Sequence, residues 1–172
     1  MQPIETQREG WRSLLEISLG EDQRDKIKEF IFTLADYNGD STYYTTLNFV
    51  KDHLNNQGIN YWINGLDWKS EISNLASRVE QSLAVNFAAS ADLPDPGSFG
   101  SPANVSTKHV FVEYDKALRE FNFQLGFIAT DGDEYVFFVH RVEDADAARA
   151  AVEKIGYKYL DKDDGKVRNE PE

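Results

Sequence analysis

The acidic residues between positions 36 and 40 are the first group that could bind a metal ion. Asp36, Asn38 and Asp40 place oxygen ligands two residues apart, as at the start of a calcium-binding loop. A complete loop also needs glycine at its sixth position and glutamate at its twelfth, where this chain has Ser41 and Leu47. We therefore predict a turn and a helix N-cap here, with no metal or cofactor.

A second acidic cluster consists of Asp131, Asp133 and Glu134, and such carboxylates can serve acid–base or metal chemistry. The pair Asp131-Gly132 is also a strong signal for a tight hairpin turn, which favours residues of this kind. Solvated turn carboxylates are thus the simpler interpretation. If the chain is instead a hydrolase or a metal-dependent enzyme, Asp131, Asp133 and His140 are the first candidates for its site.

The three histidines form no recognisable zinc-binding pattern. We expect His53 near the end of a helix, and His109 and His140 near the ends of strands. The latter two could be neighbours in a sheet, but two histidines without a third nearby ligand are a weak metal signal. The sequence also contains no nucleophile elbow, phosphate-binding loop, zinc-protease motif or dinucleotide fingerprint. No catalytic residue is assigned.

The segment from residue 36 to residue 68 combines aromatic rings with an excess of acid. Tyrosine and tryptophan provide large rigid contact areas, and carboxylates complement a basic partner, so we expect a protein-binding surface here. The alternative is that most of these rings belong to the core, as aromatic side chains usually do. The candidate partner-binding residues are Asp36, Asp40, Tyr44, Trp62, Asp67 and Trp68.

The composition limits the classes of function. The chain has 172 residues, of which 41% are hydrophobic, enough for the core of one domain. Its net charge of −12 disfavours nucleic acid and anionic membranes as partners and favours a cationic protein. There is no cysteine, which excludes disulfides and thiolate metal sites. Without a signal sequence or a long apolar run, we expect a soluble cytoplasmic protein.

Apolar residues repeat with a helical period over most of the first half of the chain. They predict helices around residues 11–19, 27–34, 43–54 and 72–87, the first two separated by a break near residues 18–21.

Two non-helical segments are expected beside these helices. Residues 59–63 are aromatic and β-branched and predict a strand or an extended loop, followed by a turn at Asn64-Gly65. Residues 88–107 are rich in proline, glycine and small side chains, which predicts a long loop.

The period changes to two in the second half, which predicts strands over residues 110–114, 121–127 and 135–139. The last two should form a hairpin around Asp131-Gly132, with Phe127 opposite Val136. This register puts Phe123, Leu125 and Phe127 on one face with Val136 and Phe138.

A last helix over residues 145–155 should return the chain to a final strand at residues 157–160. The fold class is therefore α+β, with a helical N-terminal half packed on a mostly antiparallel C-terminal sheet that has one strand–helix–strand crossover. Residues 1–160 form a single domain in this interpretation. Residues 161–172 are charged and unpatterned, and we expect them to be a disordered tail.

The order of elements from Val110 through the Asp131-Gly132 hairpin to Gly156-Tyr157 resembles that of small acidic bacterial proteins, some of which are immunity proteins of polymorphic toxin systems. The resemblance implies a binding protein that covers the active site of a toxin domain. A charge of −12 would steer its association with a cationic toxin. The resemblance transfers no functional residue.

The sequence thus favours a non-enzymatic, acidic protein-interaction domain with a basic protein partner. Two alternatives stay open. One is the enzyme described above. The other is a structural or regulatory domain that associates with itself through the second face of the hairpin, where Tyr135, Phe137 and Val139 accompany Ile128.

Overall fold

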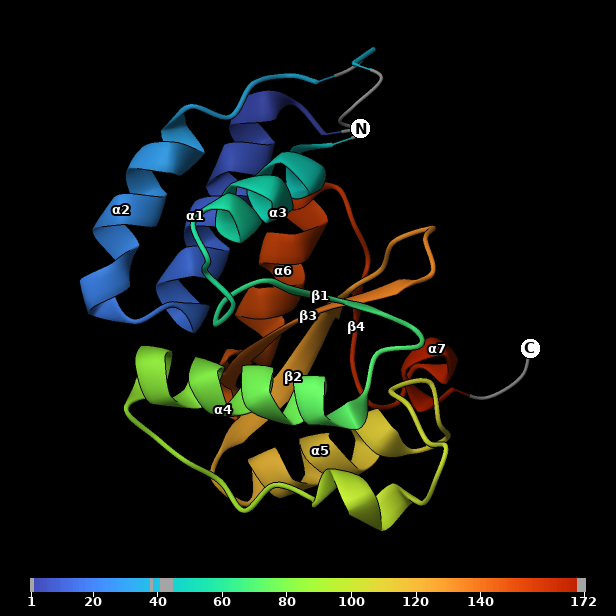
Figure 1. Cartoon of the computed structure of the whole chain (residues 1–172). Helices are drawn as coiled ribbons and strands as arrows, with labels where there is room; N and C mark the ends of the chain where they lie inside the picture. Colours follow the sequence, from blue (N-terminus) through green and yellow to red (C-terminus); the bar gives the residue numbers. More distant parts are fainter. Residues whose placement is uncertain (1, 38, 41–44, 170–172) are drawn as a thin grey trace.

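The computed structural model describes residues 2–37, 39, 40 and 45–169. A four-stranded sheet lies in the middle of the molecule, with helices α1, α2, α3 and α6 on one face and α4, α5 and α7 on the other (Figure 1). Each face of the sheet has its own hydrophobic core. The α+β class predicted from the sequence is confirmed.

The chain contains seven α-helices and four strands within the described residues. The helices are α1 (Ile4–Ser18), α2 (Glu21–Phe32), α3 (Thr46–Asn56), α4 (Ile72–Phe87), α5 (Val110–Arg119), α6 (Ala145–Ile155) and α7 (Gly165–Arg168), with 3-10 turns at Pro96–Phe99 and Val142–Asp144. The strands are β1 (Asn64–Asp67), β2 (Phe123–Ile128), β3 (Glu134–Arg141) and β4 (Tyr159–Leu160). None of the helices in the described part of the chain has the length and apolar character needed to cross a bilayer.

The helical stripes of the first half form the elements that they predict. The chain breaks between α1 and α2 at Gly20, as expected, and α4 covers residues 72–87 as predicted. Helix α3 starts later than the sequence suggests, because the Thr45 hydroxyl accepts a hydrogen bond from the Leu47 N–H and so caps the helix. The cap thus lies after residues 36–40, where the sequence predicts one, and Asn38 and Ser41 lie outside the described residues.

The sheet is antiparallel throughout, in the order β1-β3-β2-β4. Helix α6 carries the chain from β3 over the sheet to β4, which confirms the predicted crossover. Because β4 has only two residues, it pairs only with the end of β2, and the start of β2 is paired with β3 alone among the described strands. The buried Asp115 carboxylate accepts the Leu125 N–H there at 2.9 Å and pairs with Arg119. Burial raises the pKa of Asp115.

The predicted hairpin register is wrong by one residue. Phe127 pairs with Phe137 rather than with Val136, because the chain turns through a longer connection than the two residues expected. A shift of one residue moves every side chain of a strand to the other face. Phe137 and Val139 therefore lie under α4 and α5 with Phe127, whereas Val136 faces α1 and α6.

This register also determines what covers the second face of the hairpin, which includes Tyr135, Phe137 and Val139. Phe137 and Val139 are at most 2% exposed, and they are covered by helices of the same chain. Tyr135 packs at the border of that core, and Ile128 lies on the opposite face. The face proposed for self-association is thus filled from within the domain.

The structure differs from one predicted strand, and it decides between the strand and the extended loop that residues 59–63 allow. Residues 110–114 begin helix α5, because Val110, Tyr114 and Leu118 fit the helical period as well as the strand period and bury one helix face. Residues 59–63 bend instead of pairing, and the strand follows at Asn64–Asp67. Asn64 is completely buried and bonded to Arg78 and Trp62, so Asn64-Gly65 forms no turn.

Residues Gly165–Arg168 form helix α7, within the segment for which the sequence predicts a disordered tail. Asp164 caps α7 by accepting the Lys166 N–H at 3.0 Å. Val167 is 1% exposed and belongs to the core under α5. A single apolar side chain among charged neighbours was too weak a signal to indicate this docking.

Candidate functional site

An exposed aromatic ring lies beside acidic side chains where β1 ends. Trp68 is 41% exposed, and its backbone N–H donates to the Asp133 backbone oxygen at 3.1 Å, which continues the β1–β3 pairing by one residue. The Asp67 carboxylate accepts the Lys69 N–H at 2.8 Å, and the Lys69 ammonium lies 4.8 Å from the centre of the Trp68 ring. We call Asp67, Trp68 and Asp133 together the Trp68 surface.

A hollow of about 420 Å³ adjoins the Trp68 surface, which is enough space for one or two side chains of a bound protein. Lys166 borders this hollow, and its ammonium donates to the Thr130 backbone oxygen at 2.9 Å. This bond fixes the end of the hairpin against α7. The hollow is lined by Trp68, Ser106, Gly132, Asp133, Glu134, Tyr135 and Lys166.

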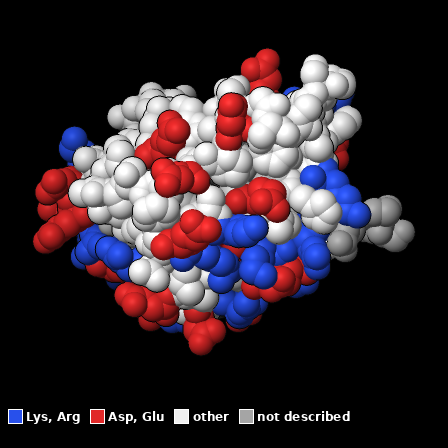
Figure 2. Space-filling model, turned by 90° about the horizontal axis from the view of Figure 1, so that it is seen from below, with Lys and Arg blue, Asp and Glu red and all other residues white. Residues whose placement is uncertain are grey.

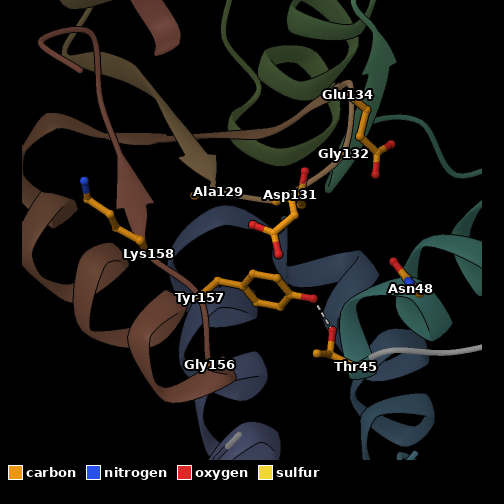
Figure 3. A pocket seen from close by; sticks show the side chains of 10 residues that line it. Thr45, Asn48, Ala129, Asp131, Gly132, Glu134, Gly156, Tyr157 and Lys158 are labelled. Atoms are coloured by element: carbon orange, nitrogen blue, oxygen red, sulfur yellow. Dashed lines mark hydrogen bonds between the residues drawn. The ribbon is translucent and has the colours of Figure 1, made fainter. Parts of the chain in front are cut away.

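A second hollow, of about 580 Å³, lies on the other side of the same hairpin, between the start of α3 and the end of α6 (Figure 3). The Asp131 carboxylate points toward the ring of Tyr157, whose hydroxyl is hydrogen-bonded to Thr45. Lys158 borders this hollow but points away from it, and its ammonium lies 3.6 Å from Asp164. The groups that face this space are therefore acidic or neutral.

The polar side chains around both hollows are mainly carboxylates, hydroxyls and amides. Glu134 borders both spaces and forms an ion pair with Lys51 on α3. Asp131 and Asp133 are exposed at the tip of the hairpin. Such groups bind cations and hydrogen-bond donors. Within the described ranges, no three carboxylate or imidazole side chains are grouped as metal ligands would be.

The residues suspected of enzyme chemistry do not come together. Asp133 immediately precedes β3 and His140 lies near its far end, so the two are roughly 20 Å apart, given the rise of an extended strand. Asp133 is exposed, whereas His140 is 0% exposed. Asp131, Asp133 and His140 therefore form no common site.

His140 belongs to a buried hydrogen-bonded chain instead. Gln124 donates to the Tyr159 hydroxyl at 3.0 Å, and this hydroxyl lies 2.8 Å from His140 Nε2. His140 Nδ1 lies 2.7 Å from the Arg141 backbone oxygen, so Nδ1 carries the proton and Nε2 accepts from Tyr159. Burial lowers the pKa of His140 to about 4. Gly126 leaves room for this chain, since an added Cβ would lie 2.8 Å from the Tyr159 ring.

The other two histidines lie elsewhere. The imidazole of His53 stacks on the ring of Phe30 with centroids 3.6 Å apart, and burial lowers the pKa of His53. His109 precedes α5 with a φ of 69°, and so it lies at a helix start and not at a strand end. The prediction that His109 and His140 could be neighbours in a sheet is wrong.

The structure separates the predicted partner-binding residues. Asp67 and Trp68 lie together beside the hairpin. Asp36 and Asp40 are exposed in the connection from α2 to α3, along the top of Figure 1. Tyr44 lies outside the described residues.

Trp62 cannot serve as an exposed contact residue, and that prediction is wrong. Its side chain is 1% exposed, and its indole N–H donates to the Ser18 hydroxyl at 2.8 Å. The ring also packs edge-on against Trp11, with centroids 6.0 Å apart. Trp62 is a core residue that joins the sheet to α1.

Sequence reasoning missed that Asp133 belongs to the Trp68 surface and that Tyr157 borders the second hollow. The turn residues of the hairpin were recognised, but as solvated carboxylates without a neighbour. Only the pairing of β1 with β3 brings Asp133 beside Trp68, 65 positions earlier in the chain. No local pattern in either segment signals this contact.

The charges of the protein are unevenly distributed. Seen from below, lysines and arginines gather in the lower half of Figure 2, with carboxylates among them, while the upper half shows scattered carboxylates on an uncharged surface. Ion pairs near α5 include Arg119–Asp115 at 2.6 Å and Lys162–Asp163 at 2.9 Å. The charge of −12 is therefore not spread evenly over the molecule.

Comparison with known proteins gives a family but no activity. No curated protein and no solved structure was found to match the chain. A family model matches residues 11–163, from the first core tryptophan of α1 to the segment just after β4. This match covers the whole sheet and its helices, apart from the start of α1 and the short helix α7. The chain thus belongs to the family described as a domain of unknown function, DUF6630.

Proposed function

We propose that the protein is a non-enzymatic protein-interaction domain that binds a basic protein partner through the Trp68 surface. The observation that carries the proposal is that Trp68, which follows the exposed Asp67 and is 41% exposed, borders a 420 Å³ hollow together with Asp133. Exposed tryptophans that border a hollow are the side chains that most often dominate protein interfaces. The proposal keeps the cytoplasmic location expected from the sequence.

The two kinds of side chain have different tasks in this proposal. The exposed carboxylates Asp67 and Asp133 attract a cationic partner and accelerate its approach. The Trp68 ring supplies the apolar contact that slows dissociation. The net charge of −12 adds a long-range attraction to any basic protein.

Neutralisation of a cationic toxin domain is one specific form of this proposal. Its support is the acidic charge, which suits a tight complex with a cationic enzyme. The family match gives no link to toxin systems. An immunity role is therefore the narrower proposal, and binding of a basic protein is the broader one.

A basic peptide tests the broader proposal directly. Trp11 and Trp62 are at most 1% exposed, so Trp68 should report binding through its fluorescence. We expect a peptide of alternating lysine and valine to change this fluorescence, and the same peptide with glutamate in place of lysine to leave it unchanged. The affinity for the basic peptide should fall as salt is added, since salt screens exposed charges.

Two variants show whether the binding occurs at the proposed place. The double variant Asp67→Asn/Asp133→Asn should slow association, and Trp68→Ala, followed with a labelled peptide, should speed dissociation. The matched control is Asp92→Asn, because Asp92 is also acidic but lies in the loop after α4. Equal binding by all variants, or no binding of the basic peptide, would contradict the proposal.

A further inference from the structure

The strand β1 forms one edge of the sheet, and none of the strands in the described residues pairs with its outer side. Figure 1 looks onto this edge, between α3 above and α4 below. The Trp68 N–H donates to Asp133, and the register continues through the pairs Leu66–Tyr135 and Asn64–Phe137. In an antiparallel pair, every second residue of a strand directs its N–H and C=O toward the paired strand, and the residues between direct theirs to the opposite side.

This alternation leaves specific backbone groups on the outer edge. Asn64 and Leu66 face β3, so the N–H and C=O of Gly65 and the N–H of Asp67 point away from the sheet. In the part of the chain that the structure describes, these three groups have no hydrogen bond, whereas the Asp67 C=O accepts from Ser70 at 2.9 Å. Gly65 is partly exposed and Asp67 is exposed. Solvent or a partner must satisfy these groups.

We infer that the partner adds an extended segment to the sheet as a fifth strand along β1, bonded to the backbone of Gly65 and Asp67. Strand addition to an open edge is a common way of binding an extended peptide, in which main-chain bonds give affinity and alternate side chains give specificity. The inference rests on the proposed function, because it states how the same basic partner is held. The Trp68 ring then packs against a side chain of the added strand.

The charges beside this edge select a basic segment as the occupant. Asp67, Glu71 and Asp133 are exposed around the end of β1, with Lys69 next to them in the chain and Lys166 at the border of the same hollow as Asp133. The Lys51 ammonium, which is also near Gly65, is paired with Glu134. A second copy of the chain is disfavoured at the same edge, because two molecules of charge −12 repel each other.

A pair of substitutions at Gly65 tests the inference on the folded protein. Gly65→Pro removes the outward N–H but no hydrogen bond inside the sheet, and proline is tolerated at such edge positions. Gly65→Ala is the matched control, since it keeps the N–H. Both variants place a Cβ 3.0 Å from the Glu134 carboxylate and 3.3 Å from Lys51 Cε, which are the mobile ends of long side chains.

The readout is the affinity for the alternating lysine–valine peptide, measured with Trp68 fluorescence. We expect Gly65→Ala to bind like the native protein and Gly65→Pro to lose about tenfold or more in affinity. A second measurement uses the native protein, so it does not depend on the folding of a variant. The amides of Gly65 and Asp67 should exchange with solvent freely in the unbound protein and become protected when the peptide binds.

The outcomes separate this inference from the proposed function. If the peptide binds without protecting the two amides, and Gly65→Pro binds normally, strand addition is wrong and the Trp68 surface binds through side chains alone. If the basic peptide does not bind at all, the proposed function fails as well. A concentration-dependent dimer that Gly65→Pro abolishes and Gly65→Ala retains would show that a second copy of the chain pairs with β1. This result would overturn the inference that a basic partner occupies this edge.

Discussion

The two ends of the β1–β3 pair are built from the same kinds of residue but differ in their access to water. At one end, Trp62 and His140 are at most 1% exposed and have hydrogen-bond partners inside the protein. At the other end, Trp68 and Asp133 are exposed beside a hollow. One end joins the sheet to α1 and β4, and the other is available to a partner.

The comparison teaches that the type of a residue does not indicate its task. Trp62 and Trp68 are six positions apart in one aromatic and acidic segment, and the sequence suggests the same role for both. Their difference follows from what covers them. Helix α1 lies against Trp62, with Ser18 and Trp11 in contact, whereas Trp68 is 41% exposed at the border of a hollow.

The largest expected difference between the two ends is in stability. Trp62→Ala should lower the free energy of unfolding by about 3–5 kcal/mol, because it removes a buried ring and leaves a cavity. Trp68→Ala should change it by about 0.5 kcal/mol, as surface substitutions do. Urea denaturation of the two variants measures both values. Similar losses in the two variants would mean that Trp68 is a core residue and would remove the proposed binding surface.

The buried end should also make stability depend on pH. The pKa of His140 is lowered from 6.5 to about 4 in the folded protein, because burial disfavours the charged imidazole. The unfolded chain then binds a proton more readily between these two values. The stability contributed by the neutral side chain is present in full above pH 6.5 and is lost as pH falls to 4, by roughly 3 kcal/mol in all.

Denaturation at a series of pH values from 7 to 4 measures this loss. His53 and Asp115 also have shifted pKa values, so the native protein alone does not isolate the effect of His140. The variant His140→Gln removes the imidazole and should show a clearly smaller loss of stability over the same range. An unchanged slope in this variant would place the pH dependence elsewhere.

A smaller effect is expected at the exposed end, where α7 supplies an apolar contact. Val167→Ala should lower the free energy of unfolding by roughly 1.5 kcal/mol, because it removes two buried methyl groups. Lys166→Ala should have little effect on stability, since its bond to Thr130 is exposed. Thermal unfolding compares the two variants. If Val167→Ala is as mild as Lys166→Ala, α7 does not stabilise the hairpin end of the domain.

Much of the fold could be predicted from local patterns. The helices α1, α2, α4 and α6 follow from long apolar stripes, and the antiparallel hairpin from two alternating runs around Asp131-Gly132. Short patterns were less informative. Val110 and Tyr114 satisfy two periods at once, and the choice between helix and strand depends on what the segment packs against.

The candidate site was predicted only in part. The sequence placed Asp67 and Trp68 in an interface, and the structure puts them at an exposed edge. The sequence also suggested Trp62 as a partner-binding residue, but Trp62 is buried in the core. It did not indicate that Asp133 lies beside Trp68. Whether an aromatic ring is core or surface depends on helices distant in sequence, so a local segment holds no information about it.

The sequence by itself determined the α+β class, the acidic charge, the absence of thiol chemistry and the positions of the long helices, because these depend on composition and on periods within one segment. Only the tertiary structure decided the hairpin register, the burial of Trp62, the docking of Val167 and the open edge at Gly65. The physical reason is that each of these depends on which segments become neighbours. A shift of one residue in a strand pair exchanges its two faces without changing any local pattern.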